Sequence, residues 1–330
     1  MAFNIGPISI DFPVLQAALS GYSDWAERTI ARRFGAAATL SEVMLDQFVL
    51  SVTGGKGKKA RRFLRVEEAD HPVGAQLMGS LPDEFADAAT RVVNWGFDWV
   101  DINFGCPVKK VLGRHRGGFH LSQPEMAIAI LRRVRDVVPE KIPVTLKMRR
   151  GLEDSEESRD HFFEIFEAAR QVGISVFTVH PRTVLQRYVG PSDWGFLCEL
   201  RQYAPDVTLL GSGDLFTAQD VVRMFGITRV NGVTIARGAI GNPWIFRDLR
   251  AVLAGQPLPP PPDLQEQREV IQEHFALADE LYGERRAVCI MKKFCVKYAM
   301  RHPQPEQVRD AFLAMQKGKD WQRVLREWYT

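Results

Sequence analysis

Short runs of apolar and β-branched residues alternate with longer amphipathic segments along most of the chain. Segments at residues 82–95, 124–138, 157–172 and 217–225 have helical periodicity, and several begin at proline or a capping residue. Eight strand–helix alternations over about 250 residues are typical of a (β/α)8 TIM barrel, whose functional groups gather at the C-terminal strand ends. We therefore predict an α/β chain built on such a barrel. The apolar runs that would form its strands cover residues 14–18, 36–40, 73–77, 99–103, 144–148, 176–180, 207–211 and 232–236.

A doubly wound parallel sheet is the structural alternative for this alternation. Such a sheet normally carries a glycine-rich phosphate loop directly after its first strand. The sequence at that place is Ala18-Leu19-Ser20-Gly21, which matches this loop poorly. The barrel is therefore the favoured architecture.

The alternation ends at a proline-rich segment that includes four consecutive prolines, Pro259 to Pro262. Such a run favours a stiff, extended connector. The residues that follow have a helical pattern, with breaks expected near Gly283, Pro303 and Gly318. We therefore predict a barrel domain at residues 1–254, a linker at 255–263 and a small helical bundle at 264–330.

Composition limits the possible classes of protein. The chain has 330 residues, is 45% hydrophobic and has a net charge of +3, so it can bury a sizeable core and its overall charge does not indicate a nucleic-acid partner. It shows no apolar run that could span a bilayer and no signal peptide pattern. The four cysteines, Cys106, Cys198, Cys289 and Cys295, have neither a pairing framework nor metal-ligand spacing. We therefore expect a cytoplasmic protein.

The segment from Asn103 to Lys110 is the most informative stretch of the sequence. Cys106 lies between glycine and proline directly after a predicted buried strand, and Lys109 and Lys110 follow it. A thiol on such a turn, next to positive charge, suits a proton donor or nucleophile that faces a polyanion. A structural cysteine in a tight turn is the alternative interpretation.

Polar residues recur at the predicted C-terminal strand ends, and each has an ordinary explanation by itself. Together, amide, lysine and imidazole groups can surround the ring edge of a flavin, where a cation stabilises the reduced ring. Small residues with an arginine after the last two strands form the usual phosphate site of a barrel. This pattern favours FMN over a sugar phosphate. The residues are Glu42, Gln76, Asn103, Lys147, Arg149, His180, Arg182, Ser212, Gly213, Asp214, Ala236, Arg237 and Gly238.

Four motifs follow one another along the chain. They are Gly105-Cys106-Pro107-Val108-Lys109-Lys110-Val111, Thr145-Leu146-Lys147-Met148-Arg149, Thr178-Val179-His180-Pro181-Arg182-Thr183 and Gly241-Asn242-Pro243-Trp244-Ile245-Phe246-Arg247. In these motifs the sequence resembles the bacterial tRNA-dihydrouridine synthases, nearest to their B-type branch. The resemblance covers nearly the whole chain.

The resemblance implies an FMN-dependent oxidoreductase that reduces the C5–C6 double bond of a uridine in tRNA, with NADPH as electron donor. Cys106 would donate the proton to C5, which an unperturbed thiol with a pKa of about 8.5 can do. Lys109 and Lys110 would then face RNA phosphates and not the sulfur. The implied cofactor-binding residues are Ala18, Leu19, Gln76, Asn103, Lys147, His180, Ser212, Gly213, Asp214, Ala236 and Arg237.

A uridine within folded RNA must be splayed out to reach a barrel mouth, so we expect cations around that mouth. Basic residues cluster at 56–62, at 109–116 and at 285–301, where the last cluster occupies a broad helical face. The residues expected to contact RNA are Lys109, Lys110, Arg114, Arg116, Arg149, Arg182, Arg286, Lys292, Lys293 and Lys297.

Several positions differ from the family pattern. Ala18-Leu19 replaces Pro-Met, Ser212 replaces Asn, and Ala236 replaces Gly. The loop Gly117-Gly118-Phe119-His120-Leu121 replaces Gly-Ser-Ala-Leu-Leu near the expected substrate. These differences leave open a flavin reductase of a free small molecule, similar to dihydroorotate or dihydropyrimidine dehydrogenases, or an RNA-binding relative without activity. The target uridine, the class of RNA, the preference for NADPH over NADH and the oligomeric state are also open.

Overall fold

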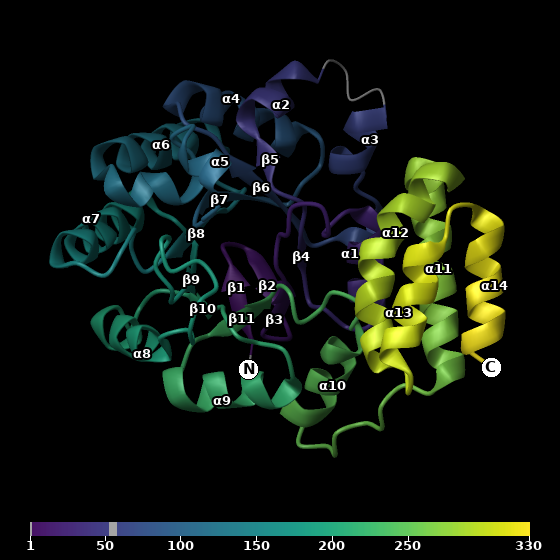
Figure 1. Cartoon of the computed structure of the whole chain (residues 1–330). Coiled ribbons are helices and arrows are strands. Elements are labelled where there is room, and N and C mark those ends of the chain that lie inside the picture. Colours follow the sequence, from purple (N-terminus) through teal and green to yellow (C-terminus); the bar gives the residue numbers. More distant parts are fainter. Residues whose placement is uncertain (1, 53–57) are drawn as a thin grey trace.

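Eight parallel strands close into a barrel in the computed structural model, which describes residues 2–52 and 58–330 (Figure 1). Each strand pairs with the next around the ring, and the pairing of β4 with β6 completes the closure. The predicted TIM barrel is therefore confirmed. Its strands are β3 (Val14–Gln16), β4 (Thr39–Leu40), β6 (Val73–Met78), β7 (Trp99–Phe104), β8 (Val144–Arg149), β9 (Val176–His180), β10 (Leu209–Gly211) and β11 (Gly232–Ile235).

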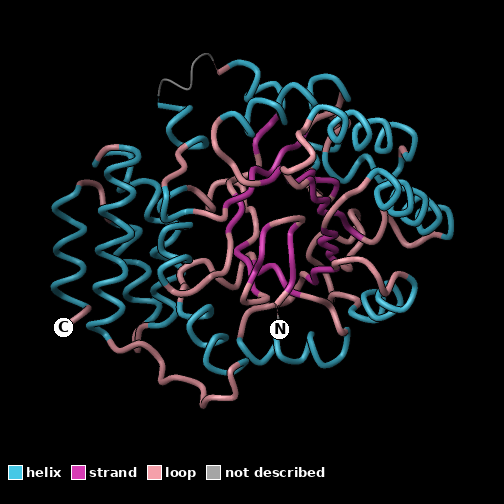
Figure 2. The backbone as a smooth tube through the Cα atoms, turned by 180° about the vertical axis from the view of Figure 1, so that it is seen from behind, coloured by secondary structure: helices cyan, strands magenta, loops and turns pink. Residues whose placement is uncertain are grey.

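Helices surround this ring of strands, as the tube in Figure 2 shows. Their starts follow ordinary capping chemistry: the side chain of Asp24 caps the first helix, and Thr217 and Asp220 form a reciprocal capping box. The helices are α1 (Trp25–Arg33), α2 (Asp46–Ser51), α3 (Lys58–Leu64), α4 (Pro82–Asn94), α5 (Lys109–Leu112), α6 (Pro124–Val137), α7 (Glu156–Val172), α8 (Trp194–Tyr203), α9 (Ala218–Thr228) and α10 (Trp244–Leu253).

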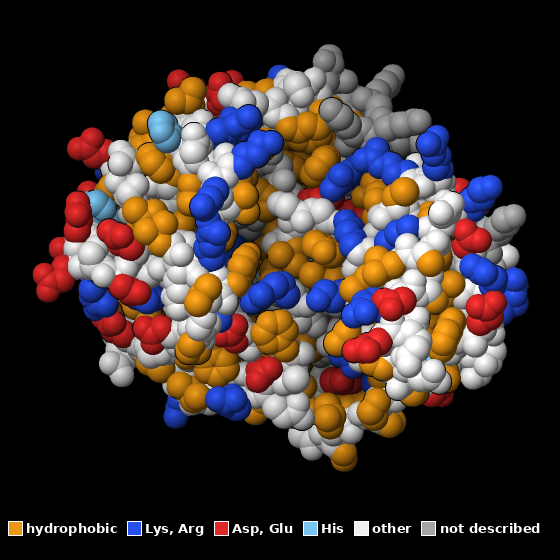
Figure 3. Space-filling model, in the orientation of Figure 1, with side chains coloured by type: hydrophobic (Ala, Val, Ile, Leu, Met, Phe, Trp, Pro, Cys, Tyr) orange, Lys and Arg blue, Asp and Glu red, His pale blue; other side chains and the backbone are white. Residues whose placement is uncertain are grey.

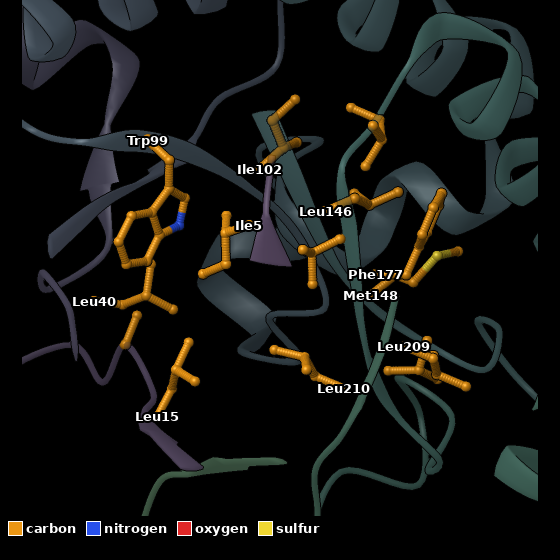
Figure 4. Packing of buried hydrophobic residues seen from close by; sticks show 14 of the residues in the cluster. Ile5, Leu15, Leu40, Trp99, Ile102, Leu146, Met148, Phe177, Leu209 and Leu210 are labelled. Carbon is orange, nitrogen blue, oxygen red and sulfur yellow. The ribbon is translucent and has the colours of Figure 1, made fainter. Parts of the chain in front are cut away.

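An N-terminal hairpin, which the sequence pattern did not reveal, packs against the barrel core. Its strands are β1 (Phe3–Ile5) and β2 (Ile8–Ile10). The last residue of each strand, Ile5 and Ile10, is 1% exposed. In Figure 2 the hairpin lies across the middle of the ring of strands. Figure 4 shows Ile5 among side chains of several barrel strands, including Leu15 and Trp99. The hairpin thereby adds apolar burial to the barrel core. A further short strand, β5 (Met44–Leu45), pairs with β6 outside the closed ring.

The C-terminal region is a bundle of helices, as predicted. The helices are α11 (Leu264–Tyr282), α12 (Glu284–Tyr298), α13 (Pro305–Ala314) and α14 (Gly318–Trp328). Residues 254–263 contain neither helix nor strand, so the proline-rich segment connects α10 to the bundle. The division of the chain into domains stays a prediction, because the two parts also share packed surfaces.

The bundle packs directly on the barrel through a shared apolar cluster. Ile30 of α1 and Trp244 of α10 belong to the same cluster as Met291 and Phe294 of α12. In Figures 1 and 2, α11 and α12 lie beside these barrel helices. None of the helices in residues 2–52 and 58–330 is long and apolar enough to cross a membrane.

Candidate active site

A cavity of about 930 Å³ opens at the C-terminal ends of the barrel strands. Its wall continues beyond the barrel onto Pro261 and Pro262 of the connector and Lys297, Met300 and Arg301 near the end of α12. Figure 3 shows the hollow on this face, with Lys and Arg side chains gathered around it. Both parts of the chain therefore build one site.

Most of the side chains that the sequence assigns to a cofactor meet in this wall. Gln76 is the exception, because it is 0% exposed and does not line the cavity. Its Oε1 accepts a hydrogen bond from Asn103 Nδ2 at 2.6 Å, so Gln76 supports the wall from behind. The predicted residues that line the cavity are Cys106, Ala18, Leu19, Asn103, Lys147, His180, Ser212, Gly213, Asp214, Ala236 and Arg237.

Cys106 is half-buried and occupies a turn that is held on two sides. Asn103 Oδ1 accepts from the backbone N–H groups of Gly105 at 3.0 Å and Cys106 at 3.1 Å. The Gly118 N–H donates to the Cys106 carbonyl at 3.1 Å. Gly117 has a φ of +59°, and a Cβ there would lie 2.8 Å from Cys106 Cβ, so this close approach requires glycine. The turn therefore fixes the position of the sulfur.

The charge state of the Cys106 thiol follows from its surroundings. Burial raises its pKa, and the Val108 N–H and the charges of Arg149 and Lys147 only partly offset this effect. Lys109 and Lys110 are exposed, and they are not among the groups that shift the pKa of Cys106. The thiol therefore keeps its proton at neutral pH, as an acid in catalysis requires.

Lys147 is half-buried and places its ammonium group in the cavity wall, opposite Asn103 in the register of β7 and β8. Burial, with a smaller contribution from Arg149, lowers the pKa of Lys147 to about 8, although Asp101 and Cys106 act in the opposite direction. Across residues 2–52 and 58–330, no side chain or carbonyl accepts a hydrogen bond from its Nζ. The ammonium group is therefore available to an acceptor atom of a ligand.

His180 at the end of β9 is a neutral imidazole. Burial, followed by the charges of Lys147, Arg149, Arg182 and Arg237, lowers its pKa to about 2. Nδ1 accepts from the Arg182 backbone N–H at 3.3 Å, which leaves Nε2 as the protonated ring nitrogen. His180 can therefore donate a hydrogen bond to a ligand without contributing charge.

The loops after β10 and β11 have the small residues expected of a phosphate site. Gly213 has a φ of +100°, and a Cβ there would collide with Ser192 Oγ, which explains the glycine. The Asp214 carboxylate accepts from Arg182 Nη2 at 2.7 Å and from the Ser192 N–H at 2.7 Å. That carboxylate is already paired, whereas Arg237 makes no ion pair with any residue in 2–52 and 58–330 and can face an anionic ligand.

Three arginines expected to contact RNA are buried and donate to acceptors within the protein. Arg149 is 2% exposed, and its guanidinium donates to the carbonyls of Gly105, Thr183 and Arg187. Arg182 is 3% exposed and is paired with Asp214. Arg116 is 6% exposed and donates to Gln47 Oε1. Most of their donors are engaged inside the protein, and RNA contact by these three groups stays a prediction.

The remaining predicted cations fall into two sets. Lys109, Lys110 and Arg114 are exposed on and after α5, beside Cys106, and Arg286 and Lys297 are exposed on α12. Only Lys297 of these lines the cavity. These groups remain candidates for RNA contact.

Two other cations of α12 contact the protein. Lys292 Nζ donates to the Leu313 carbonyl at 3.0 Å. Lys293 Nζ lies 4.7 Å from the ring centroid of Tyr22, in the barrel loop that lines the cavity. Of the predicted basic cluster at 56–62, Lys56 and Gly57 lie outside the described residues, and Arg62 is paired with Glu42.

Sequence reasoning missed several residues of the wall. Tyr188 and Phe216 are exposed at the rim, and the Arg237 guanidinium carbon lies 4.5 Å and 5.3 Å from their ring centroids. Aromatic residues in loops give no periodic signal. Pro261 and Pro262 signalled only a stiff connector, and nothing in their pattern indicated that they line a cavity.

Comparison with known proteins identifies the family. A sequence model described as "Dihydrouridine synthase (Dus)" matches residues 15–328. The chain belongs to the dihydrouridine synthase family. It is 32% identical over 324 residues to a probable tRNA-dihydrouridine synthase of Mycobacterium tuberculosis, covering 97% of this chain and 82% of the relative. It is 31% identical over 306 residues to tRNA-dihydrouridine synthase B of Xanthomonas axonopodis pv. citri, covering 93% and 89%.

Solved structures share the barrel fold at low sequence identity. Morphinone reductase in complex with tetrahydroNAD gives a TM-score of 0.54 at 14% identity, covering 79% of this chain and 92% of that one. Histamine dehydrogenase from Rhizobium sp. 4-9 gives a TM-score of 0.60 at 13% identity, covering 84% of this chain. The chain spans about half, 50%, of the histamine dehydrogenase. These matches support the fold.

The loop that differs from the family pattern is well packed in this member of the dihydrouridine synthase family. His120 Nε2 lies 2.9 Å from the Gly79 carbonyl oxygen, and its ring centroid is 4.8 Å from that of Phe104. Phe119 stacks on His115 with centroids 4.5 Å apart. The bulkier residues therefore pack on Phe104 and His115, while the adjacent glycines allow the Cys106 turn to form.

Proposed function

We propose that this protein binds FMN in the cavity and reduces the C5–C6 double bond of a uridine in tRNA to 5,6-dihydrouridine, with NADPH as the electron donor. The observation that carries the proposal is that Cys106, whose pKa is raised by burial, lies in the same cavity wall as Lys147 and His180. Membership of the dihydrouridine synthase family and the names of its relatives support the same reaction. The identity of the cofactor as FMN and that of the electron donor as NADPH both belong to this proposal.

The cavity residues fit an anionic flavin nucleotide. The wall has the half-buried ammonium of Lys147, the guanidinium of Arg237 and an Asp214 carboxylate already paired with Arg182. A volume of about 930 Å³ lies at the upper end of ordinary cofactor sites, so it can hold FMN and part of a substrate. Arg237 with Ser212 and Gly213 would hold the phosphate, whereas Lys147, His180 and Asn103 would face the ring system.

Bound FMN, once reduced by NADPH, would supply the hydride that is added at C6 of the uracil. The chain supplies the other half of the addition, because Cys106 Sγ–H holds the proton that C5 requires. Lys147 stabilises negative charge that develops beside it, and neutral His180 adds a donor without competing for the proton. The turn held by Asn103 and Gly118 keeps the sulfur in place during the transfer.

RNA would approach across exposed cations on opposite sides of the cavity. Lys109, Lys110 and Arg114 lie on the side of Cys106, and Arg286 and Lys297 lie on α12. A uridine splayed from the RNA would enter between them while phosphates contact the cations. The proposal includes a cytoplasmic location, where free thiols such as Cys106 stay reduced.

The test uses purified protein, NADPH and unmodified tRNA transcripts. A flavin absorption band and a mass gain of two hydrogens at one uridine, found by mass spectrometry of RNA digests, are expected. Free uracil in place of tRNA distinguishes the small-molecule reductase, since turnover of uracil at the rate found with tRNA contradicts the proposed substrate.

The matched control for the thiol is Cys106→Ala, which should retain flavin and NADPH-driven flavin reduction. Product formation should fall by roughly 10²–10⁴-fold, the usual effect of a positioned acid. Parental product formation in this variant would mean that Cys106 is structural. A protein that binds RNA but neither binds flavin nor forms product would be a relative without activity.

A further inference from the structure

Four buried side chains form a continuous row of hydrogen bonds beneath the cavity. Asp101 of β7 accepts from Thr145 Oγ1 of β8 and, at 2.6 Å, from Gln76 Nε2 of β6. Gln76 Oε1 accepts from Asn103 Nδ2 at 2.6 Å. Asn103 then accepts the backbone N–H groups of the Cys106 turn. The row therefore connects the barrel interior to the turn that presents the thiol.

The chemistry of Asp101 gives this row a direction. An ionised carboxylate can only accept, so the atom of Gln76 that faces it must be the amide nitrogen. The amide oxygen of Gln76 then faces Asn103 and requires the nitrogen of Asn103 in return. This leaves Asn103 Oδ1 for the turn, where two N–H groups need an acceptor. Each amide has two possible orientations, and the carboxylate selects the one that suits Cys106.

We propose that Asp101 is a positioning residue for Cys106, which it acts on through the amides of Gln76 and Asn103. The role of Cys106 as proton donor rests on the proposed function, whereas the positioning does not. Asp101 itself does not line the cavity, so it would contribute without touching substrate or cofactor.

The burial of the row explains why the orientation of its amide groups matters. Asp101 is 2% exposed, Gln76 0% and Asn103 6%, so water cannot replace a lost partner. Burial raises the pKa of Asp101, while the hydrogen bonds from Thr145 and Gln76 and the charge of Lys147 oppose this. A carboxylate at this depth is unfavourable for stability by itself. An acceptor that fixes the orientation of two amides gives a reason for its presence.

The test exchanges the side chains of Asp101 and Asn103, which lie on either side of Gln76 in the row. In Asn103→Asp, two carboxylates compete for the one NH2 group of Gln76, so the Cys106 turn should be displaced. In Asp101→Asn, either amide atom can face Gln76, so the direction is no longer fixed. The double variant Asp101→Asn/Asn103→Asp matches every donor with an acceptor again, because Gln76 simply reverses. It also restores the parental net charge.

The readout is alkylation of Cys106 by iodoacetamide, followed at that residue by peptide mass spectrometry because other cysteines are also free. The limiting rate at high pH is compared, since the thiol is then ionised in every variant and charge effects on its pKa drop out. Asn103→Asp should change this rate by about tenfold, and the double variant should return to within about threefold of the parent. Thr145→Val removes the hydrogen bond to Asp101 on the side away from Cys106, so its rate should stay near that of the parent.

Parental rates in both single variants, or additive changes in the double variant, would overturn the proposal. Where a single variant is poorly folded, the free energy of unfolding in urea tests the proposal in place of the alkylation rate. The double variant must then be more stable than Asn103→Asp alone. Dihydrouridine formation is measured separately in the parental protein. Its absence would overturn the proposed function and leave the result for the Cys106 turn unchanged.

Discussion

Replacing Lys147 by methionine should make the flavin-free protein more stable while it removes a group required for activity. In the folded chain the pKa of Lys147 falls from 10.5 to about 8, mainly because its ammonium is buried. Each pKa unit corresponds to about 1.36 kcal/mol, so holding this charge in the folded state costs about 3 kcal/mol below pH 8. Methionine has a similar length without the charge, so Lys147→Met should recover most of that free energy.

The difference in stability between parent and variant should depend on pH. Between pH 8 and pH 10.5 the folded lysine is mostly neutral while the unfolded lysine is still protonated, so the unfolded state binds more protons. The stability of the parent should therefore rise with pH across this window relative to the variant. The difference of about 3 kcal/mol at pH 7 should shrink to near zero above pH 10.5.

Urea unfolding of flavin-free parent and variant at several pH values measures the difference. Lys110→Met, at an exposed position of α5, is the matched control and should change stability by less than about 0.5 kcal/mol. A variant less stable than the parent at pH 7, or a difference that stays constant up to high pH, would refute the reasoning. The same variant should bind flavin weakly or reduce it slowly, because the charge that offsets reduced flavin is gone.

Further predictions concern the cations around the cavity and the glycine in its wall. Replacing Lys109 and Lys110 together by alanine should weaken RNA binding and lower the slope of log affinity against log salt by nearly two, with flavin content unchanged. Lys293→Met should instead alter flavin retention and leave the salt slope near parental, since this ammonium packs on the barrel loop that lines the cavity; a reduced salt slope would assign it to RNA. Gly213→Ala should cost at least about 1–2 kcal/mol in urea unfolding, because its φ is +100° and the added Cβ meets Ser192 Oγ. Unchanged stability there would show that the loop relaxes freely.

The strands of the barrel could be predicted from sequence because each lies in a short run of apolar or β-branched residues, such as Val-Phe-Thr-Val in β9. The bundle helices could also be located, since Gly283 and Gly318 lie at their boundaries. The hairpin of β1 and β2 was missed because three-residue strands are too short to show a period. Its place at a predicted strand end put Gln76 at the cofactor, but its hydrogen bond to Asn103 depends on how neighbouring strands align.

The basic residues show where sequence reasoning about a site fails. Arg149 and Arg182 belong to family-like motifs and lie at strand ends, which are the positions where a ligand contact is expected. Whether an arginine faces solvent or backbone carbonyls depends on the loops that cross it, and here the loop at residues 181–193 supplies those carbonyls. The charge is visible in the sequence, whereas the carbonyls that accept from Arg149 come from segments more than thirty residues away.

The shared cavity wall bears on how the two parts of the chain work together. Lys297 and the connector prolines complete a wall that begins at Cys106 in the barrel, so a chain that ends at residue 254 would lack one side of the site. It would also uncover Ile30 and Trp244, which pack in one apolar cluster with residues of the bundle. The bundle holds the barrel loop at the cavity as well, because Tyr282 donates to Asp24 Oδ2 at 2.7 Å. RNA bound on α12 would therefore contact a helix that already helps to shape the cofactor site.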